Sequence, residues 1–230
     1  MLSAGSAAMV LLFDIAADAI VEHDDWHTHE HIPERLAIPG FLRGSRWIAR
    51  SGSPRYLMMY EVQSLATLAS SPYLERLNNP SPWTAKMMRS YIGMRRALCE
   101  VAASFGSGMG ASALLIPYAT DEDHGSALRG WLAREALPGL VNRPGIASAH
   151  LFATGLTAAM TREQQIRGKD AGLDEAVLVT GYEMDVIAAL ADGELSRETF
   201  AARGATVAEN AGGVYQLAYS LTAGEAAAPH

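Results

Sequence analysis

Residues 26–40 read WHTHEHIPERLAIPG, and residues 131–145 read WLAREALPGLVNRPG. The tryptophan, the glutamate, the two prolines and the glycine of the first stretch all recur in the second at a constant separation of 105 positions. A separation that holds over five residues is typical of an internal repeat. The sequence therefore predicts a module that is present twice.

A second match and a glycine-rich run together indicate where each copy begins and ends. Tyr60 and Tyr182 correspond at a separation of 122 positions, and a polar insertion near residues 155–174 accounts for the additional length. The glycine-rich run at residues 105–110 lies where a linker between the copies is expected. We predict one module at residues 1–105, a second at residues 110–222, and a disordered tail at residues 223–230.

Each copy has the order strand, helix, strand, strand, helix, strand, which is the ferredoxin-like unit. Pro33 and Pro138 predict the end of the first helix of each copy, because proline cannot donate a helical hydrogen bond. Two open sheets bury their faces best against each other. The predicted fold is therefore α+β, with two tandem ferredoxin-like modules whose antiparallel sheets pack into an α/β barrel. The predicted strands lie at about 7–15, 41–50, 55–62, 94–103, 111–119, 146–154, 176–183 and 213–222, and the predicted helices at about 18–32, 64–78, 82–91, 122–137 and 185–203.

The composition is that of an ordinary folded protein, with 49% hydrophobic and 19% charged residues among 230. The net charge is −7 and no Lys/Arg run exceeds Arg95–Arg96, which argues against a nucleic-acid or membrane partner. Cys99 is the single cysteine, so no internal disulfide forms. The apolar run Ala7–Phe13 is too short to span a bilayer and lacks the flanks of a signal peptide. We expect a cytoplasmic protein.

The quoted stretch resembles the first-helix signature of the dimeric α/β-barrel superfamily. Within that superfamily it is most similar to the EthD-like proteins, whose pattern is an acidic residue, histidine, an apolar residue and proline, followed by Pro-Gly; these are Glu30 to Pro33 and Pro39-Gly40 here. The segment 79–84 is also similar to small bacterial members. The second copy matches only in outline, since Ala136 occupies the histidine position. The resemblance implies cofactor-free monooxygenases, isomerases, cyclases and decarboxylases as possible relatives, as well as haem enzymes, so it does not specify a reaction.

Three histidines of the first helix, His23, His27 and His31, share one helical face. The second copy has Leu128, Leu132 and Ala136 at the equivalent positions, so this face is covered and the imidazoles indicate a site in the first copy only. An imidazole beside a carboxylate is suited to acid/base catalysis near neutral pH. We expect His31 to be the general base or acid, His27 to orient it or bind a substrate oxygen, and Glu30 to be the adjacent carboxylate. The alternative is that these histidines make structural hydrogen bonds.

Six further residues are candidates for contact with a substrate. Arg46 and Trp47 are neighbours on a strand and face opposite sides, so one of them faces the helix-side cleft; Arg46 there would hold a carboxylate or enolate oxygen. Trp83 and Arg89 follow two prolines and would form a lid, with simple packing as the alternative. The predicted substrate-binding residues are Trp26, Arg46, Trp47, Tyr60, Trp83 and Arg89.

We expect a cofactor-independent enzyme that acts on a small apolar or aromatic metabolite through His31. Isomerase, cyclase, lyase, decarboxylase and carbanion oxygenation chemistry remain open, and no metal or other cofactor is expected. A homodimer is the expected assembly. One alternative is an oxidoreductase that binds a metal at His27 and His31 with Glu34 or Glu61, or haem at His124 or His150. The other is a barrel that binds a small molecule without transforming it.

Overall fold

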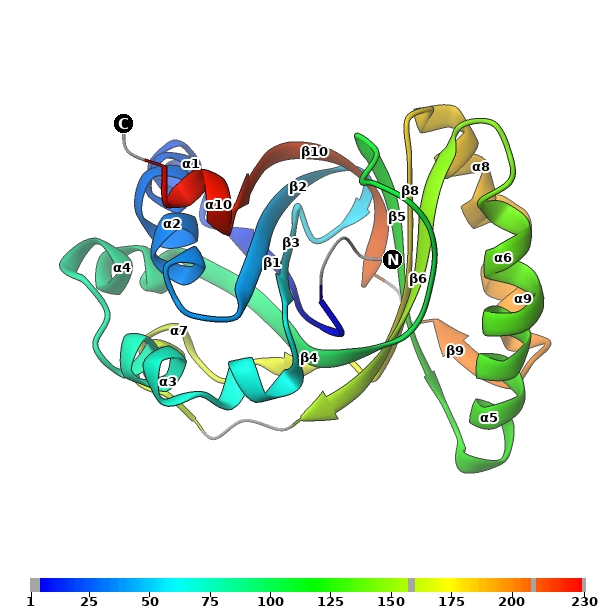
Figure 1. The fold of residues 1–230 in the computed structure, drawn as a ribbon, viewed down its shortest axis with the longest axis horizontal. Helices are drawn as coiled ribbons and strands as arrows, with labels where there is room; N and C mark the ends of the chain where they lie inside the picture. Colours follow the sequence, from blue (N-terminus) through cyan, green and yellow to red (C-terminus); the bar gives the residue numbers. More distant parts are fainter. Residues whose placement is uncertain (1–4, 157–159, 208–209, 229–230) are drawn as a thin grey trace.

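The computed structural model describes residues 5–156, 160–207 and 210–228. Its strands and helices follow one another in the order expected for two ferredoxin-like units (Figure 1). The strands are β1 (Ala7–Ile15), β2 (Phe41–Ser53), β3 (Tyr56–Val62), β4 (Tyr91–Gly106), β5 (Ser112–Thr120), β6 (Ile146–Leu156), β7 (Ala171–Gly172), β8 (Glu175–Gly181), β9 (Ala205–Val207) and β10 (Gly212–Thr222). The helices are α1 (Ile20–Trp26), α2 (Ile32–Leu36), α3 (Ser71–Asn78), α4 (Pro82–Met87), α5 (Glu122–Trp131), α6 (Leu137–Leu140), α7 (Arg162–Arg167), α8 (Met184–Asp192), α9 (Arg197–Ala201) and α10 (Ala223–Ala226).

The main strands form a closed antiparallel barrel within one chain. Their order is β1-β3-β2-β10-β5-β8-β6-β4, and β4 pairs with β1 to close the ring. The first copy contributes β4-β1-β3-β2 and the second β10-β5-β8-β6, so each half has the same strand order. The pairs β2–β10 and β4–β6 join the halves. This arrangement confirms the predicted fold class.

Alternation along the strands divides the core into three parts. Val10 and Leu12 of β1 lie inside the barrel with Trp47 of β2, while Met9 and Leu11 face the helices of the first copy. A matching cluster lies between the second copy's strands and its own helices. The helices of the two copies cover opposite sides of the barrel (Figure 1). No helix in the described ranges is long and apolar enough to cross a membrane.

The first helix of each copy does not end at its proline, contrary to the sequence prediction. In the first copy α1 continues through a π-turn at His27–His31 into α2, which contains Pro33 and ends at Leu36. In the second copy a π-turn at Leu132–Ala136 leads into α6 in the same way. The wider turn changes the hydrogen-bond spacing just before the residue that lacks an N–H, so the helix passes through the proline.

Three other predictions at the level of elements need correction. The helix expected at 64–78 is a 3-10 turn at Leu65–Ala69 followed by α3, and the helix expected at 185–203 is divided into α8 and α9 after Gly193. The tail expected to be disordered from residue 223 begins with α10, which Thr222 caps through its side chain. Residues 229–230 lie outside the described residues.

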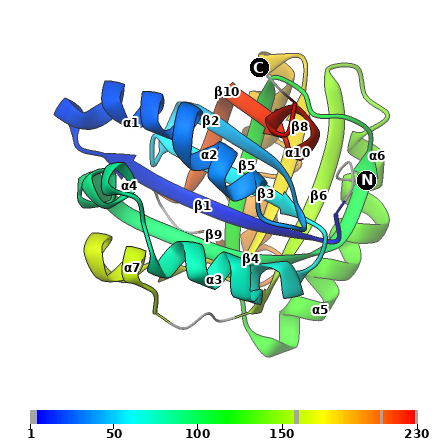
Figure 2. The same cartoon turned by 60° about the vertical axis from the view of Figure 1, so that its left-hand side comes forward.

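The insertion of the second copy packs against the first copy. Its helix α7 lies beside α3 and α4, on the side of the barrel that carries α1 and α2 (Figures 1 and 2). The short strand β7, also in the insertion, pairs with β4 of the first copy at Arg95 and Arg96. A segment of module two therefore completes the surroundings of the module-one helices.

Candidate active site

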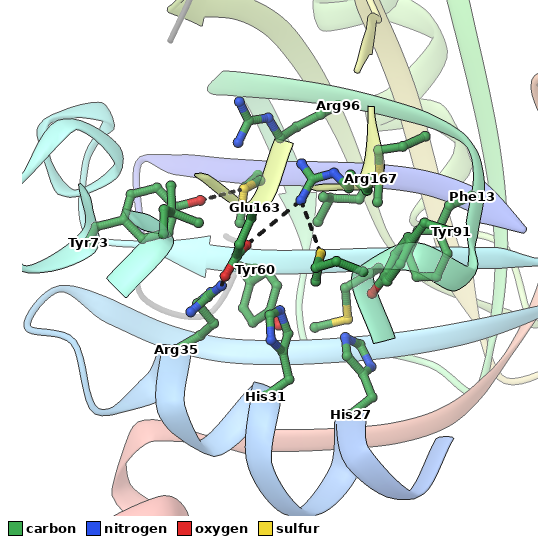
Figure 3. A pocket seen from close by; sticks show the side chains of 16 residues that line it. Phe13, His27, His31, Arg35, Tyr60, Tyr73, Tyr91, Arg96, Glu163 and Arg167 are labelled. Atoms are coloured by element: carbon green, nitrogen blue, oxygen red, sulfur yellow. Dashed lines mark hydrogen bonds and ion pairs between the residues drawn. The ribbon is translucent and has the colours of Figure 1, made fainter. Parts of the chain in front are cut away.

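A cavity of about 30 Å³ lies between the first helix and the outer face of the first copy's sheet. Figure 3 shows Arg35, His31 and His27 projecting into it in a row from one helix, toward Tyr60 and Glu163. Aromatic, methionine and leucine side chains form most of the wall. These are Met9, Leu11, Phe13, Met58, Tyr60, Tyr73, Leu77, Met88, Tyr91 and Met94.

The two imidazoles that line the cavity are buried and stacked. The ring centroids of His27 and His31 are 5.3 Å apart, and the Trp26 indole lies 4.4 Å from the His31 ring. Burial lowers the pKa of both imidazoles well below its usual value, and the positive charge of Arg35 lowers the pKa of His31 further. Both side chains are therefore neutral at pH 7 and free of the proton that a general base must accept.

The π-turn sets the positions of the two histidine side chains. The second copy has the same turn with other side chains. Leu132 is buried at the position equivalent to His27, and Ala136 stands at the position of His31. The helix of the second copy packs in an aliphatic cluster. π-turns often occur at functional sites, but here both copies have one. The difference between the copies lies in the side chains and points to one site, in module one.

A buried ionic network closes the cavity on the side of the insertion. Arg35 forms an ion pair with Glu163 of α7, whose other oxygen lies 3.7 Å from Arg167. Arg167 donates two hydrogen bonds of 2.9 and 2.8 Å to Asp170, which also pairs with Arg96 at 3.1 Å. These side chains are at most 8% exposed. The network ties the insertion of module two to the site of module one.

Three buried polar atoms at the cavity have no hydrogen-bond partner among the described residues. They are Nδ1 of His31, Nη1 of Arg35 and the hydroxyl oxygen of Tyr60. Burial raises the pKa of Tyr60 well above its usual value, so its hydroxyl keeps the proton. A buried polar group without a partner is costly, and at a cavity it indicates where a polar ligand atom or a water molecule binds.

Glu30 and Trp26 lie next to the cavity but are not among the residues that line it. The Glu30 carboxylate accepts hydrogen bonds from the Trp26 indole at 3.2 Å and from Thr84 at 3.2 Å, and a further one from Ser81. These contacts fasten the first helix to α4 and turn the carboxylate away from the cavity. Trp26 packs against His31 but does not line the cavity.

The predicted substrate-binding residues lie at different places. Tyr60 lines the cavity, whereas Arg46 lies behind His27, with Nη1 3.5 Å from its Nδ1 and 3.7 Å from Asp24. Arg46 therefore faces the helix, and Trp47 points into the barrel interior because neighbours on a strand alternate. Trp83 donates to Glu22 outside the cavity, and Arg89 is exposed. Trp47 and Arg89 are thus not part of this cavity.

Sequence reasoning missed Arg35, Arg96, Glu163 and Arg167. Arg35 and Glu163 are 128 residues apart, and no local pattern links them. Two signals were present in the sequence. Arg35 follows His31 by one helical turn, and the polar insertion is the one place where the copies differ in length.

The alternative cofactor sites do not fit the residues observed. His150 lies inside the barrel with both ring nitrogens bonded to serine hydroxyls, at 2.9 and 3.0 Å, and His124 is exposed beside Asp121. The cavity that His150 lines inside the barrel has a volume of about 10 Å³. Within the described ranges no group of three His, Cys, Asp or Glu side chains is placed to hold a metal ion. Glu61 pairs with Arg43, and Glu34 with Arg76.

Comparisons with known proteins show the fold. No family model and no curated protein matches this sequence. An anthrone oxidase-like protein superposes with a TM-score of 0.66 at 14% identity, over 98% of this chain and 97% of that chain. A proposed monooxygenase from Fusobacterium nucleatum superposes with a TM-score of 0.60 at 7% identity, and a proposed chlorite dismutase with 0.57 at 13%, each over 96% of both chains. Likenesses at this identity show the fold, and the relation to the dimeric α/β-barrel superfamily and to its EthD-like members stays a prediction.

Proposed function

We propose that this protein is a cofactor-independent enzyme that removes a proton from a small, largely apolar or aromatic substrate. The base is His31, and His27 stacks behind it. One observation carries the proposal: two buried, neutral imidazoles face a cavity walled by aromatic and thioether side chains, and the equivalent helix of the sister module has Leu132 and Ala136 in their place.

The arrangement supports proton transfer in both directions. A neutral imidazole accepts a proton from an acidic C–H or O–H bond of the substrate. Burial and Arg35 disfavour the imidazolium that results, so His31 returns the proton readily to another atom of the same molecule. The negative charge that develops on the substrate would be stabilised by the net positive charge of the arginines beside the cavity.

What happens to the substrate anion determines the type of reaction. Reprotonation at another atom gives an isomerisation, and attack on a second group of the same molecule gives a cyclisation. Reaction with dioxygen gives an oxygenation. The names of the structural neighbours, an anthrone oxidase-like protein and a proposed monooxygenase, favour oxygenation of an enolisable aromatic ketone. A barrel that binds a small molecule without transforming it is the second candidate.

The test uses anthrone and anthrone-2-carboxylate as substrates in air-saturated buffer with a chelator present. We expect oxygen consumption above the uncatalysed rate, and loss of at least 99% of that activity in His31→Gln. The matched control is His29→Gln, which changes an imidazole of the same helix whose side chain is 69% exposed. If His31→Gln remains folded and retains activity, His31 is not the base.

Exchange of substrate hydrogen for deuterium separates the two candidates when no oxygen is consumed. An enzyme that isomerises or cyclises still exchanges the acidic hydrogen of an enolisable ketone with solvent, and it does so through His31. A protein that only binds does not accelerate this exchange.

A further inference from the structure

The charges around the cavity do not balance. Among the described side chains that line the cavity or pair with those that do, Arg35, Arg96 and Arg167 carry three positive charges, and Glu163 and Asp170 carry two negative ones. The cavity histidines are neutral. Arg46 lies outside the lining and has Asp24 as its own partner. Each arginine has a carboxylate partner, but because Arg96 and Arg167 share Asp170, the described side chains of this buried cluster carry one net positive charge, which is costly in a protein interior.

The unpaired donors show where a counter-ion would bind. Arg35 bonds Glu163 through Nη2, and among the described residues its Nη1 has no hydrogen-bond partner beside the cavity. The same part of the chain offers no partner to the Tyr60 hydroxyl or to Nδ1 of His31. Guanidinium and hydroxyl donors bind carboxylate oxygens through short, charge-assisted hydrogen bonds. Arg167 and Arg96 also line the cavity but already pair with Asp170, and most of the remaining wall is methionine, leucine and aromatic side chains.

We propose that the substrate is an organic monoanion whose carboxylate binds Arg35 Nη1 and the Tyr60 hydroxyl. Its apolar or aromatic body lies among the methionine and aromatic side chains. This inference rests on the proposed function for the location of the site and adds the charge of the substrate. A phenol is neutral at pH 7 and would leave the surplus charge unbalanced, whereas a carboxylic acid is ionised. A doubly charged phosphate would leave one excess negative charge.

The volume of the cavity implies that the ligand also displaces part of its wall. A space of about 30 Å³ holds about one water molecule, so even a single aromatic ring requires movement of neighbouring groups. The insertion helix α7 carries Glu163, which occupies one side of Arg35. A ligand carboxylate and Glu163 therefore compete for Arg35, and neutralising Glu163 is expected to strengthen binding of the anion.

Calorimetric titration with benzoate and with benzamide tests the charge directly, because the two probes share a shape. We expect benzoate to bind at least tenfold more tightly than benzamide at pH 7. Glu163→Gln is expected to tighten benzoate binding about tenfold, since it raises the surplus from one positive charge to two. Arg76→Gln is the control, because Arg76 pairs with Glu34 at the surface and is expected to leave binding unchanged.

A double variant separates contact with Arg35 from the general field of the cluster. Arg35→Gln with Glu163→Gln removes both members of one ion pair, so the net charge of the cluster stays the same and neither partner is left unpaired. We expect benzoate binding to fall at least tenfold in this folded protein. Equal binding of benzoate and benzamide, no binding of either, or full benzoate binding by the double variant would each overturn the proposal.

The result of the benzoate and benzamide titrations does not depend on whether the protein is a catalyst. Selective benzoate binding combined with no proton transfer by His31 overturns the proposed function and supports this inference. Proton transfer by His31 without selective benzoate binding supports the proposed function and overturns this inference.

Discussion

Removal of one member of the Arg35–Glu163 ion pair is expected to destabilise the protein strongly, and removal of both only slightly. Both side chains are almost fully buried, at 2% and 3% exposure. Arg35→Met leaves the Glu163 carboxylate in a dry interior, with Arg167 3.7 Å away as its remaining ionic contact. Breaking a buried pair costs about 3–5 kcal/mol of unfolding free energy, because the remaining charge has lost its counter-ion. The contact with Arg167 favours the lower end, near 3 kcal/mol.

The double variant, Arg35→Met with Glu163→Leu, replaces the pair by apolar side chains of similar length. Such replacements are often neutral, so we expect a change within about 1 kcal/mol of the wild type. The two single changes should then fail to add by several kcal/mol, which is the signature of a direct interaction. In thermal unfolding, 3 kcal/mol corresponds to a fall in Tm of roughly 6–12 °C for a chain of this size.

Guanidinium unfolding followed by circular dichroism measures these free energies. Arg76→Met is the control, since Arg76 is 42% exposed and its pair with Glu34 is expected to contribute at most about 1 kcal/mol. Single variants that lose less than 1 kcal/mol, or a double variant whose loss equals the sum of the two, would refute the view that this pair binds the insertion to module one.

Three further outcomes follow from the site. Burial lowers the pKa of His27 and His31 in the folded state. As the pH falls below about 6.5, the histidines of the unfolded chain therefore take up protons before those of the folded protein do. For these two groups the unfolding free energy should fall by up to about 2.7 kcal/mol per pH unit. Guanidinium titrations from pH 7.5 to 5 measure that slope, which should flatten in His27→Leu with His31→Ala, the residues of the second copy. Glu30→Ala should cost about 2–3 kcal/mol through the lost hydrogen bonds and leave kcat per folded molecule unchanged, whereas a catalytic Glu30 would show in kcat. Trp47→Ala should cost about 3–5 kcal/mol as a cavity in the barrel interior, and unchanged benzoate affinity would agree with its place there.

The residues themselves determined the duplicated fold. Apolar alternation and turn residues act over short distances, so their repetition at a separation of 105 positions predicted two equal units and their strands. The comparison of His27 and His31 with Leu132 and Ala136 predicted a site in the first copy, because equivalent helices bury equivalent faces. The same local reasoning was wrong at Pro33, where the π-turn carries the helix onward.

Only the tertiary structure decided what surrounds the histidines. Glu30 belongs to the same helical face as His31 in sequence, yet its carboxylate accepts hydrogen bonds from Trp26 of α1, from Ser81, which caps α4, and from Thr84 of α4, and it does not line the cavity. Arg35 meets Glu163 because the barrel brings the insertion of module two against module one, across 128 residues of chain. Contacts between distant segments depend on how whole sheets and helices pack. The pattern of residues along the chain does not predict these contacts. The charge of the site, and with it the kind of ligand we infer, comes from those contacts.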